Sequence, residues 1–408
     1  MNNNFSFYFI LFSLIFGVVL YDQISLMGFT YIDEIIALLL FVECIFRKKI
    51  GSEYRKFLFL SLLFLLYSII KTVNTVPAAF TDFFIITKPF IAFYSVYYMG
   101  LQLNDKHKSF LRRIIIMLAL VFFFGALVNY DLFVWTIPIH ASRFATMMVI
   151  FAFMYYYCTK RDKSSILLTI AIMSVSLLSL RSKAYGFFTI VLFSLYFFNS
   201  KKFKLNIISM VGAFVGIFLV IFVSWEKISF YFMEGAQSDY IEDYMARPAL
   251  YSGAVLVLKD YPIMGPGLGT YASYASAKYY SPLYAHYNLD KVHGLNEEGS
   301  FITDAFFPSL AQYGIIGIFF FFFFFYRRYL DIKKNKLNNG NVMWFKMSLL
   351  FLVFFFIEST SDSTLAQNRG LVMMILFAMY LKDKQIPMTN KLTRKHSNLL
   401  GGDFDIKG

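Results

Sequence analysis

Four basic residues stand at the ends of apolar segments with no acidic residue within three positions. They are Arg143, Arg181, Lys183 and Arg247. A guanidinium group fits phosphate oxygens through two parallel hydrogen bonds, and an ammonium group offers a compact positive charge. We therefore expect Arg181 and Arg247 to bind a phosphate-type anion, such as a diphosphate leaving group. For Arg143 and Lys183, binding of the same anion and ordinary ion pairing are equally good interpretations.

A second set of residues could accept the proton of an attacking hydroxyl group. His293 lies in a polar stretch, His286 precedes it, and Asp304 stands near the start of a long apolar run. A neutral imidazole and a carboxylate can both act as a general base. A lone histidine in a loop is more often only solvated, and Asp304 could equally cap a helix. The sequence favours His293 narrowly, with Asp304 as the alternative.

Other kinds of site are not indicated. No group of His, Cys, Asp and Glu has metal-ligand spacing, and no Ser-His-Asp order is recognisable, so the sequence predicts neither a metal nor another cofactor. Cys44 and Cys158 lie in or at the end of apolar runs, which excludes a disulfide framework. The glycine-rich stretch 265–269 lacks the strand and the Lys-Ser/Thr pair of a P-loop, and we interpret it as a tight turn.

The elements that must position these residues are membrane helices. The 408 residues are 58% hydrophobic and only 15% charged, with a mean hydropathy of +0.59. Soluble domains are nearer one-half apolar and about one-quarter charged. This composition predicts an all-α polytopic membrane protein. The net charge of +13 is explained by basic loops, so no nucleic-acid partner is predicted.

About twelve apolar runs are candidates for spanning helices, each of which needs about 20 residues. The runs are 5–20, 31–46, 57–75, 80–100, 114–130, 142–158, 165–181, 184–199, 205–224, 302–326, 344–358 and 370–381. Most of the 38 basic residues fall in alternate loops. Because such loops stay in the cytosol, both termini are predicted to be cytoplasmic.

This topology divides the chain into four parts. Residues 1–224 hold transmembrane helices 1–9, 225–300 form one large periplasmic loop with short helices, 301–381 hold helices 10–12, and 382–408 form a flexible cytoplasmic tail. The loop is rich in tyrosine, which suits either a membrane interface or carbohydrate contact. Within it, the stretch from Arg247 to Pro262 predicts a short helix that starts beside one proline and stops before another.

The order of residues in this loop resembles that of the O-antigen polymerase and O-antigen ligase superfamily. Arg247 and its helix are followed by Pro262, the glycines of 265–269, a His-bearing loop and the sequence Gln312-Tyr313-Gly314-Ile315-Ile316-Gly317. The step Leu180-Arg181-Ser182-Lys183 and Arg143 are also similar to features of that family. The resemblance covers the whole chain in topology and roughly 247–317 in motif.

The resemblance implies an inverting, metal-independent glycosyl transfer in the bacterial inner membrane, with an undecaprenyl diphosphate-linked glycan as donor and acceptor. A chain-length regulator protein is a further expected partner. Ligases tend to carry a histidine about eleven residues before the glycine that corresponds to Gly314. Here that position is Thr303, beside Asp304, which favours the polymerase branch. A ligase, a lipid-linked oligosaccharide flippase and a membrane acyltransferase are the alternatives.

Overall fold

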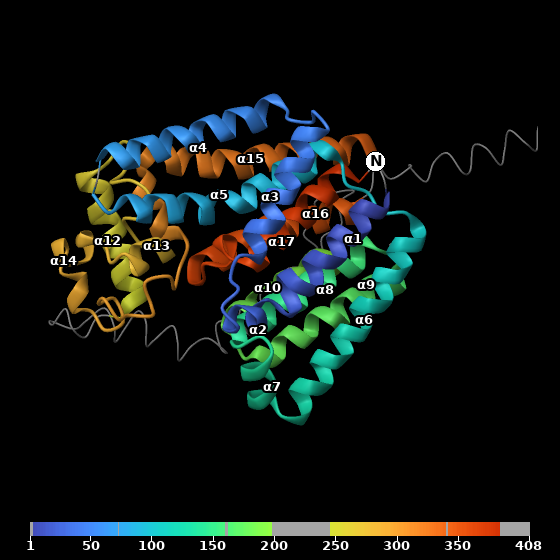
Figure 1. The fold of residues 1–408 in the computed structure, drawn as a ribbon. Helices are drawn as coiled ribbons and strands as arrows, with labels where there is room; N and C mark the ends of the chain where they lie inside the picture. Colours follow the sequence, from blue (N-terminus) through green and yellow to red (C-terminus); the bar gives the residue numbers. More distant parts are fainter. Residues whose placement is uncertain (1–2, 72, 160–161, 198–244, 340–341, 384–408) are drawn as a thin grey trace, which may run out of the picture.

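The computed structural model describes residues 3–71, 73–159, 162–197, 245–339 and 342–383, and every regular element within them is a helix (Figure 1). The N-terminal part contains α1 (Asn3–Leu14), η1 (Ile15–Val19), α2 (Tyr21–Leu26), α3 (Ile32–Phe46), α4 (Ser52–Lys71), α5 (Val76–Met99), α6 (Asp105–Val128), α7 (Tyr130–Thr136), α8 (Ala141–Tyr157), α9 (Lys163–Ser174), η2 (Val175–Ser179), α10 (Ser182–Leu192) and η3 (Phe193–Phe197). The C-terminal part contains α12 (Ala246–Asp260), α13 (Tyr274–Lys278), α14 (Pro282–His286), η6 (Leu289–Lys291), η7 (Phe307–Tyr313), α15 (Gly314–Asn339), α16 (Val342–Ser361), η8 (Thr364–Ala366) and α17 (Asn368–Lys382).

Local sequence signals set several of these helix ends. The side chain of Thr75 accepts a hydrogen bond from the backbone N–H of Ala78 and so caps α5, which ends where Gly100 adopts a left-handed conformation. Asn104 caps α6 in the same way. Short polar side chains at these positions satisfy backbone donors that have no partner inside the helix. Both ends of α5 are therefore determined locally, before any packing between helices.

The centre of the bundle is α17, which packs against α5 (Figure 1). Its side chains are buried from Asn368 to Leu381, and the rings of Phe93 and Phe377 meet at a centroid distance of 5.6 Å. A helix that is apolar on all faces is expected to be buried on all faces. The same holds for α8, whose side chains are buried from Phe144 to Tyr157.

Membrane insertion is supported by helix length and composition. Within the described residues, four stretches are long and apolar enough to cross a bilayer, and the pair α7 and α8, bent by 80°, makes a fifth if it is one broken span. The four are Val76–Met99, Asp105–Val128, Phe307–Asn335 and Val342–Ser361. The protein is therefore an all-helical membrane protein as far as the described residues reach.

The full set of twelve spans stays a prediction. The predicted runs that lie within the described residues are helical over most of their length, with turns at 302–306 as an exception. Several of these helices are short, such as α3 and α17 with 15 residues each. Fifteen residues rise only about 22 Å, whereas the hydrocarbon core is about 30 Å thick. The predicted run 205–224 and the tail from 384 onward lie outside the described residues.

One end of the bundle, which we call the basic end, is held by a buried arginine. Arg328 of α15 is 1% exposed and donates to Glu53 of α4 at 2.5 Å, while its second nitrogen lies 3.1 Å from Asp331. The rings of Phe93 and Tyr97 pack over the same guanidinium at 5.4 and 5.0 Å. These contacts tie α4, α5 and α15 together. The basic loop that follows α3 lies at this end, and the basic residues between 327 and 336 belong to α15 itself.

At the opposite end, which we call the cavity end, the segment 245–302 folds over the helices (Figure 1). The helix predicted from Arg247 is confirmed as α12, and the segment has a hydrophobic core of its own. Tyr271 and Tyr284 stack inside that core at a ring distance of 5.8 Å, and neither is exposed. These two tyrosines therefore have a structural role in the outer segment.

The predicted glycine turn joins this segment to the bundle. Gly265, Gly267 and Gly269 all have positive φ angles, which glycine adopts without strain. The N–H of Gly269 donates to Asp82 of α5 at 3.0 Å, and Tyr67 of α4 donates to the carbonyl of Gly265 at 2.8 Å. The turn therefore anchors the outer segment on α4 and α5, and in this structure its N–H groups face protein oxygens.

Candidate functional site

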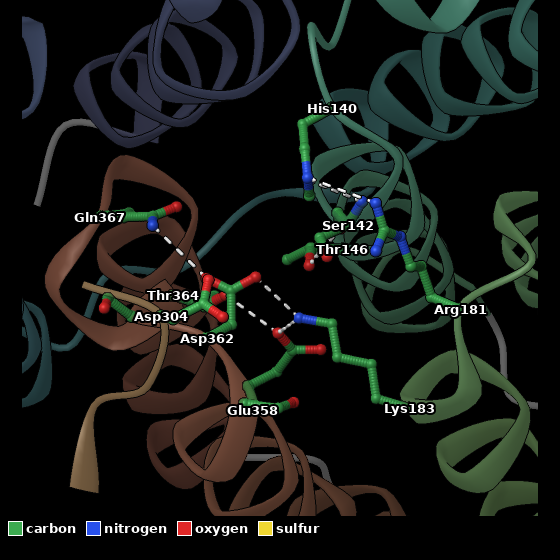
Figure 2. A network of polar contacts seen from close by, with 12 residues as sticks. His140, Ser142, Thr146, Arg181, Lys183, Asp304, Glu358, Asp362, Thr364 and Gln367 are labelled. Carbon is green, nitrogen blue, oxygen red and sulfur yellow. Dashed lines mark hydrogen bonds and ion pairs between the residues drawn. The ribbon is translucent and has the colours of Figure 1, made fainter. Parts of the chain in front are cut away.

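Lys183 lies between two carboxylates at the cavity end (Figure 2). It is in the first turn of α10, and its Nζ lies 2.7 Å from Glu358 Oε2 and 2.7 Å from Asp362 Oδ2. Glu358 also accepts a hydrogen bond from Thr364 at 2.9 Å. Lys183 therefore joins α10 to the end of α16, and the ion-pairing interpretation of this residue is confirmed.

Arg247 lies beside Asp304 in the neighbouring part of the same end. Its Nη2 donates to Asp304 Oδ2 at 2.7 Å and to the carbonyl of Ser361 at 3.5 Å. On the same helix, Tyr251 donates to the carbonyl of Thr360 at 2.9 Å. These contacts dock α12 on the end of α16. Burial raises the pKa of Asp304 above its usual value, although the charge of Arg247 opposes this shift.

The interpretation of Asp304 as a helix cap is wrong. Residues 301–306 form turns, and the first helical residue after them is Phe307, which opens the 3₁₀ helix η7. The α-helix begins only at Gly314, later than the predicted run 302–326 implies. The carboxylate of Asp304 is therefore not used by a helix terminus, and its hydrogen bond goes to Arg247.

Arg181 lies at the turn between η2 and α10, where Leu180 has a φ of +52°. Its Nη2 is 3.3 Å from Nε2 of His140 (Figure 2). The other ring nitrogen of His140 accepts a hydrogen bond from the N–H of Ser142 at 3.2 Å and so caps α8. No carboxylate pairs with Arg181 in the part of the chain that the structure describes.

A third ion network surrounds Asp22 of α2. This carboxylate is 2% exposed and lies 2.7 Å from Arg143 and 3.1 Å from Arg369. Arg369 of α17 therefore pairs with α2 at this point of the bundle. Gln367 accepts from Arg369 at 2.9 Å and donates to Asp362 at 3.4 Å, so it connects this network to the one around Lys183.

A polar cavity of about 750 Å³ opens at this end of the molecule. Asp22, Arg143 and Arg369 line one part of its wall, and Tyr274 and Lys278 of α13 line another. A third part carries Lys88, which pairs with Asp33 and Glu34 of α3. Thr303 and Ser363, the neighbours of Asp304 and Asp362, also line the cavity.

An apolar groove of about 250 Å³ adjoins this cavity. It runs between α4, α5 and α15, and its lining is mostly phenylalanine and leucine. Ile86 and Phe306 line both spaces. A polar space next to an apolar one suits an amphiphile, with its charged head in the first and its chain in the second.

The structure brings together five of the six main candidates, namely the four basic residues and Asp304 but not His293. His286, the seventh candidate, is exposed at the end of α14. His140 interacts electrostatically with Arg143, Arg181, Lys183 and Asp362, and Asp304 does so with Arg247, Lys183 and Asp362. Only Arg143 of the six lines the cavity itself. His293 is exposed on the outer segment, where its ring faces Phe301 at 6.2 Å, and the structure does not bring it to the charged cluster.

Three residues of this region were missed by reasoning from the sequence. Asp22 and His140 have partners 41 or more positions away, and Gln367 links two networks through an uncharged side chain. Only His140 carries a local signal, because it directly precedes a helical run.

Within the described residues, no group of three His, Cys, Asp or Glu side chains could hold a metal ion.

Comparisons with protein-family models, with curated proteins and with solved structures gave no match. The resemblance to the O-antigen polymerase and ligase superfamily therefore rests on the sequence motifs alone.

Proposed function

We propose that this chain is a membrane glycosyltransferase of the O-antigen polymerase type, which joins undecaprenyl diphosphate-linked oligosaccharide repeat units. The observation that carries this proposal is the gathering of Arg143, Arg181 and Lys183 near Asp304, beside a polar cavity and an apolar groove that share lining residues. Such a site offers cations for a phosphate group, a carboxylate for a proton and an apolar surface for a lipid chain.

A lipid-linked donor has three chemically different parts, and the cavity end offers a surface for each. The isoprenoid chain would occupy the groove between α4, α5 and α15, which is lined by rings such as Phe57 and Phe321. The diphosphate would lie near Arg181. The sugars would fill the polar cavity, where Tyr274 and Asn368 offer ring and hydrogen-bonding surfaces.

The reaction needs one base and one anion-binding group. A hydroxyl of the acceptor sugar attacks the anomeric carbon of the donor, and its proton passes to the carboxylate of Asp304. The bond between the anomeric carbon and the diphosphate oxygen breaks, and undecaprenyl diphosphate leaves with the electron pair. Arg181 stabilises the growing negative charge, as a preorganised cation does in a water-poor site.

The remaining cations have supporting roles in this proposal. Arg143 and Lys183 are paired with carboxylates, and we assign them to holding the helix ends in place around the diphosphate. Arg247 donates to Asp304 and orients the carboxylate toward the acceptor. We prefer Asp304 over His293 as the base because the carboxylate lies in the charged cluster, whereas His293 is exposed beside Phe301.

The proposal includes the full topology, with about twelve spans, both termini in the cytosol and the segment 225–300 in the periplasm. Cysteine labelling of intact cells tests this arrangement. Ser52→Cys and Ser300→Cys place thiols on exposed residues at opposite ends of the bundle, and the native Cys44 and Cys158 are buried. An impermeant reagent should label residue 300 and spare residue 52, and the reverse pattern contradicts the orientation.

Deletion of the gene separates the competing functions. We expect the cell surface to keep single repeat units on its lipid core and to lose the long polysaccharide ladder on a gel. Loss of single units together with the ladder would instead indicate a ligase or a flippase, because both act on every form of the glycan. An unchanged ladder would contradict all three functions.

A further inference from the structure

Two nitrogen-bearing side chains approach each other at the cavity end without an obvious acceptor between them. Arg181 Nη2 and His140 Nε2 are 3.3 Å apart, a distance typical of a hydrogen bond (Figure 2). A guanidinium group carries only donors, so this contact is a hydrogen bond only if Nε2 of the histidine is an acceptor. Whether it can be one depends on what the other ring nitrogen does.

The second contact of the ring decides the tautomer. Nδ1 of His140 faces the backbone N–H of Ser142 at 3.2 Å and accepts its hydrogen bond at the start of α8. Ser142 is buried and its N–H is fixed by the helix, so this donor cannot turn to another acceptor. A neutral imidazole carries one hydrogen, and with Nδ1 as acceptor that hydrogen is on Nε2. Nε2–H and the guanidinium then face each other as two donors.

The surrounding charges show which kind of group would relieve this contact. The charged groups that interact with His140 are Arg181, Arg143, Lys183 and Asp362. Arg143 is paired with Asp22, and Asp362 is one of the two carboxylates held by Lys183. Arg181 has no carboxylate partner among the described residues. The group that fits is therefore an anion with an oxygen that accepts from both side chains.

We propose that His140 Nε2–H and the guanidinium of Arg181 together bind one phosphate oxygen of a diphosphate ligand. This inference rests on the proposed function for the identity of the ligand, and it adds a residue that the sequence motifs do not include. His140 has two separable roles: Nδ1 caps α8, and Nε2–H binds the anion. The cap places the ring hydrogen on Nε2, and this hydrogen makes the ring a hydrogen-bond donor to an anion.

Two substitutions separate these roles. In His140→Asn, the Oδ1 atom takes the place of Nδ1 and asparagine is a preferred helix cap, but no donor remains at the Nε2 position. In His140→Gln, the side-chain NH₂ can reach the Nε2 position, but the cap is lost. Lys259→Ala, on the exposed end of α12, removes one positive charge elsewhere and serves as the control.

The experiment measures binding of inorganic pyrophosphate to the purified full-length protein by calorimetry in phosphatidylcholine nanodiscs. We expect His140→Asn and Arg181→Ala each to weaken binding about ten- to a hundredfold, the effect of one lost hydrogen bond to a charged group. His140→Gln should stay within about threefold of the wild type by the same reasoning, although its thermal stability falls. Lys259→Ala should bind as the wild type does.

The opposite pattern overturns the proposal. Wild-type binding by His140→Asn would show that the ring only caps α8, and absence of binding by the wild-type protein would remove the site altogether. Nanodiscs of phosphatidylglycerol provide a second arm: if this lipid abolishes pyrophosphate binding, the site takes a lipid headgroup and the assignment to a diphosphate is wrong. Failure of polymer synthesis with intact pyrophosphate binding would contradict the proposed function and leave this site standing.

Discussion

Arg247 Nη2 lies 2.7 Å from Asp304 Oδ2, although 57 positions separate the two residues in the chain. From the sequence, Arg247 is expected to bind an anion and Asp304 is a candidate general base. Their hydrogen bond makes them a unit instead, because the orientation of the carboxylate depends on the guanidinium. The same contact also fixes α12 on the turn that leads into η7. This one pair therefore sets both the position of α12 and the orientation of the Asp304 carboxylate.

The first prediction concerns the identity of the base. Asp304→Asn keeps the shape of the side chain and removes its basicity, so we expect the polymerisation rate to fall by a factor of about 10² or more. His293→Ala should stay near the wild-type rate, since this residue is exposed and remote from the cluster. The rates are measured with purified protein and lipid-linked repeat units. A normal rate for Asp304→Asn with a slow His293→Ala would reverse the assignment.

The second prediction concerns pH. Asp304 must be ionised to accept a proton, so activity is lost as the pH falls through its pKa. Burial raises that pKa above the usual aspartate value of about 3.9, while Arg247 and Lys183 act against the shift and Asp362 adds to it. The acid limb of the rate profile should therefore lie at a higher pH than an ordinary aspartate would give, and Arg247→Gln should move it higher still. An acid limb that Arg247→Gln leaves unchanged would assign the titration to another group.

The third prediction concerns stability. Lys183→Met leaves Glu358 and Asp362 close together without their shared cation, and loss of one partner of a buried ion pair costs about 3–5 kcal/mol of unfolding free energy. The double variant Lys183→Met with Glu358→Gln removes one of the two charges and should melt at a higher temperature than the single variant. Thermal unfolding in detergent measures both. Equal melting temperatures would mean that the carboxylates do not repel each other.

The fourth prediction concerns the glycine turn. Gly265 has a φ of +71°, and a Cβ atom there would lie 2.2 Å from the carbonyl oxygen of Gln312. Gly100 has a similar φ of +66° with open space around it, so it is a matched control. Gly100→Ala should cost only the left-handed strain of about 1–2 kcal/mol. Gly265→Ala should lower the melting temperature further, and equal effects would show that the outer segment is not clamped at this turn.

The sequence was sufficient for the features that depend on local patterns. Apolar runs predicted helices where the structure has them, Arg247 marked α12, and the glycines of 265–269 marked a turn. Partners across the bundle could not be predicted, because no local signal joins Asp22 to Arg369 or His140 to Arg181. The same holds for Glu358 and Asp362, whose shared cation Lys183 lies 175 or more positions away. The site arises from helix ends that only the packing of α10, α16 and α17 brings together.

The central claim is that this chain links glycan repeat units through the cluster at the cavity end. The most direct measurement is incubation of the purified protein in liposomes with undecaprenyl diphosphate-linked repeat units, followed by separation of the products by size. We expect a ladder of polymers and release of undecaprenyl diphosphate with the wild type, and single repeat units alone with Asp304→Asn or Arg181→Ala. A wild-type protein that leaves the repeat units unjoined, or an Asp304→Asn protein that makes the same ladder, would contradict the account.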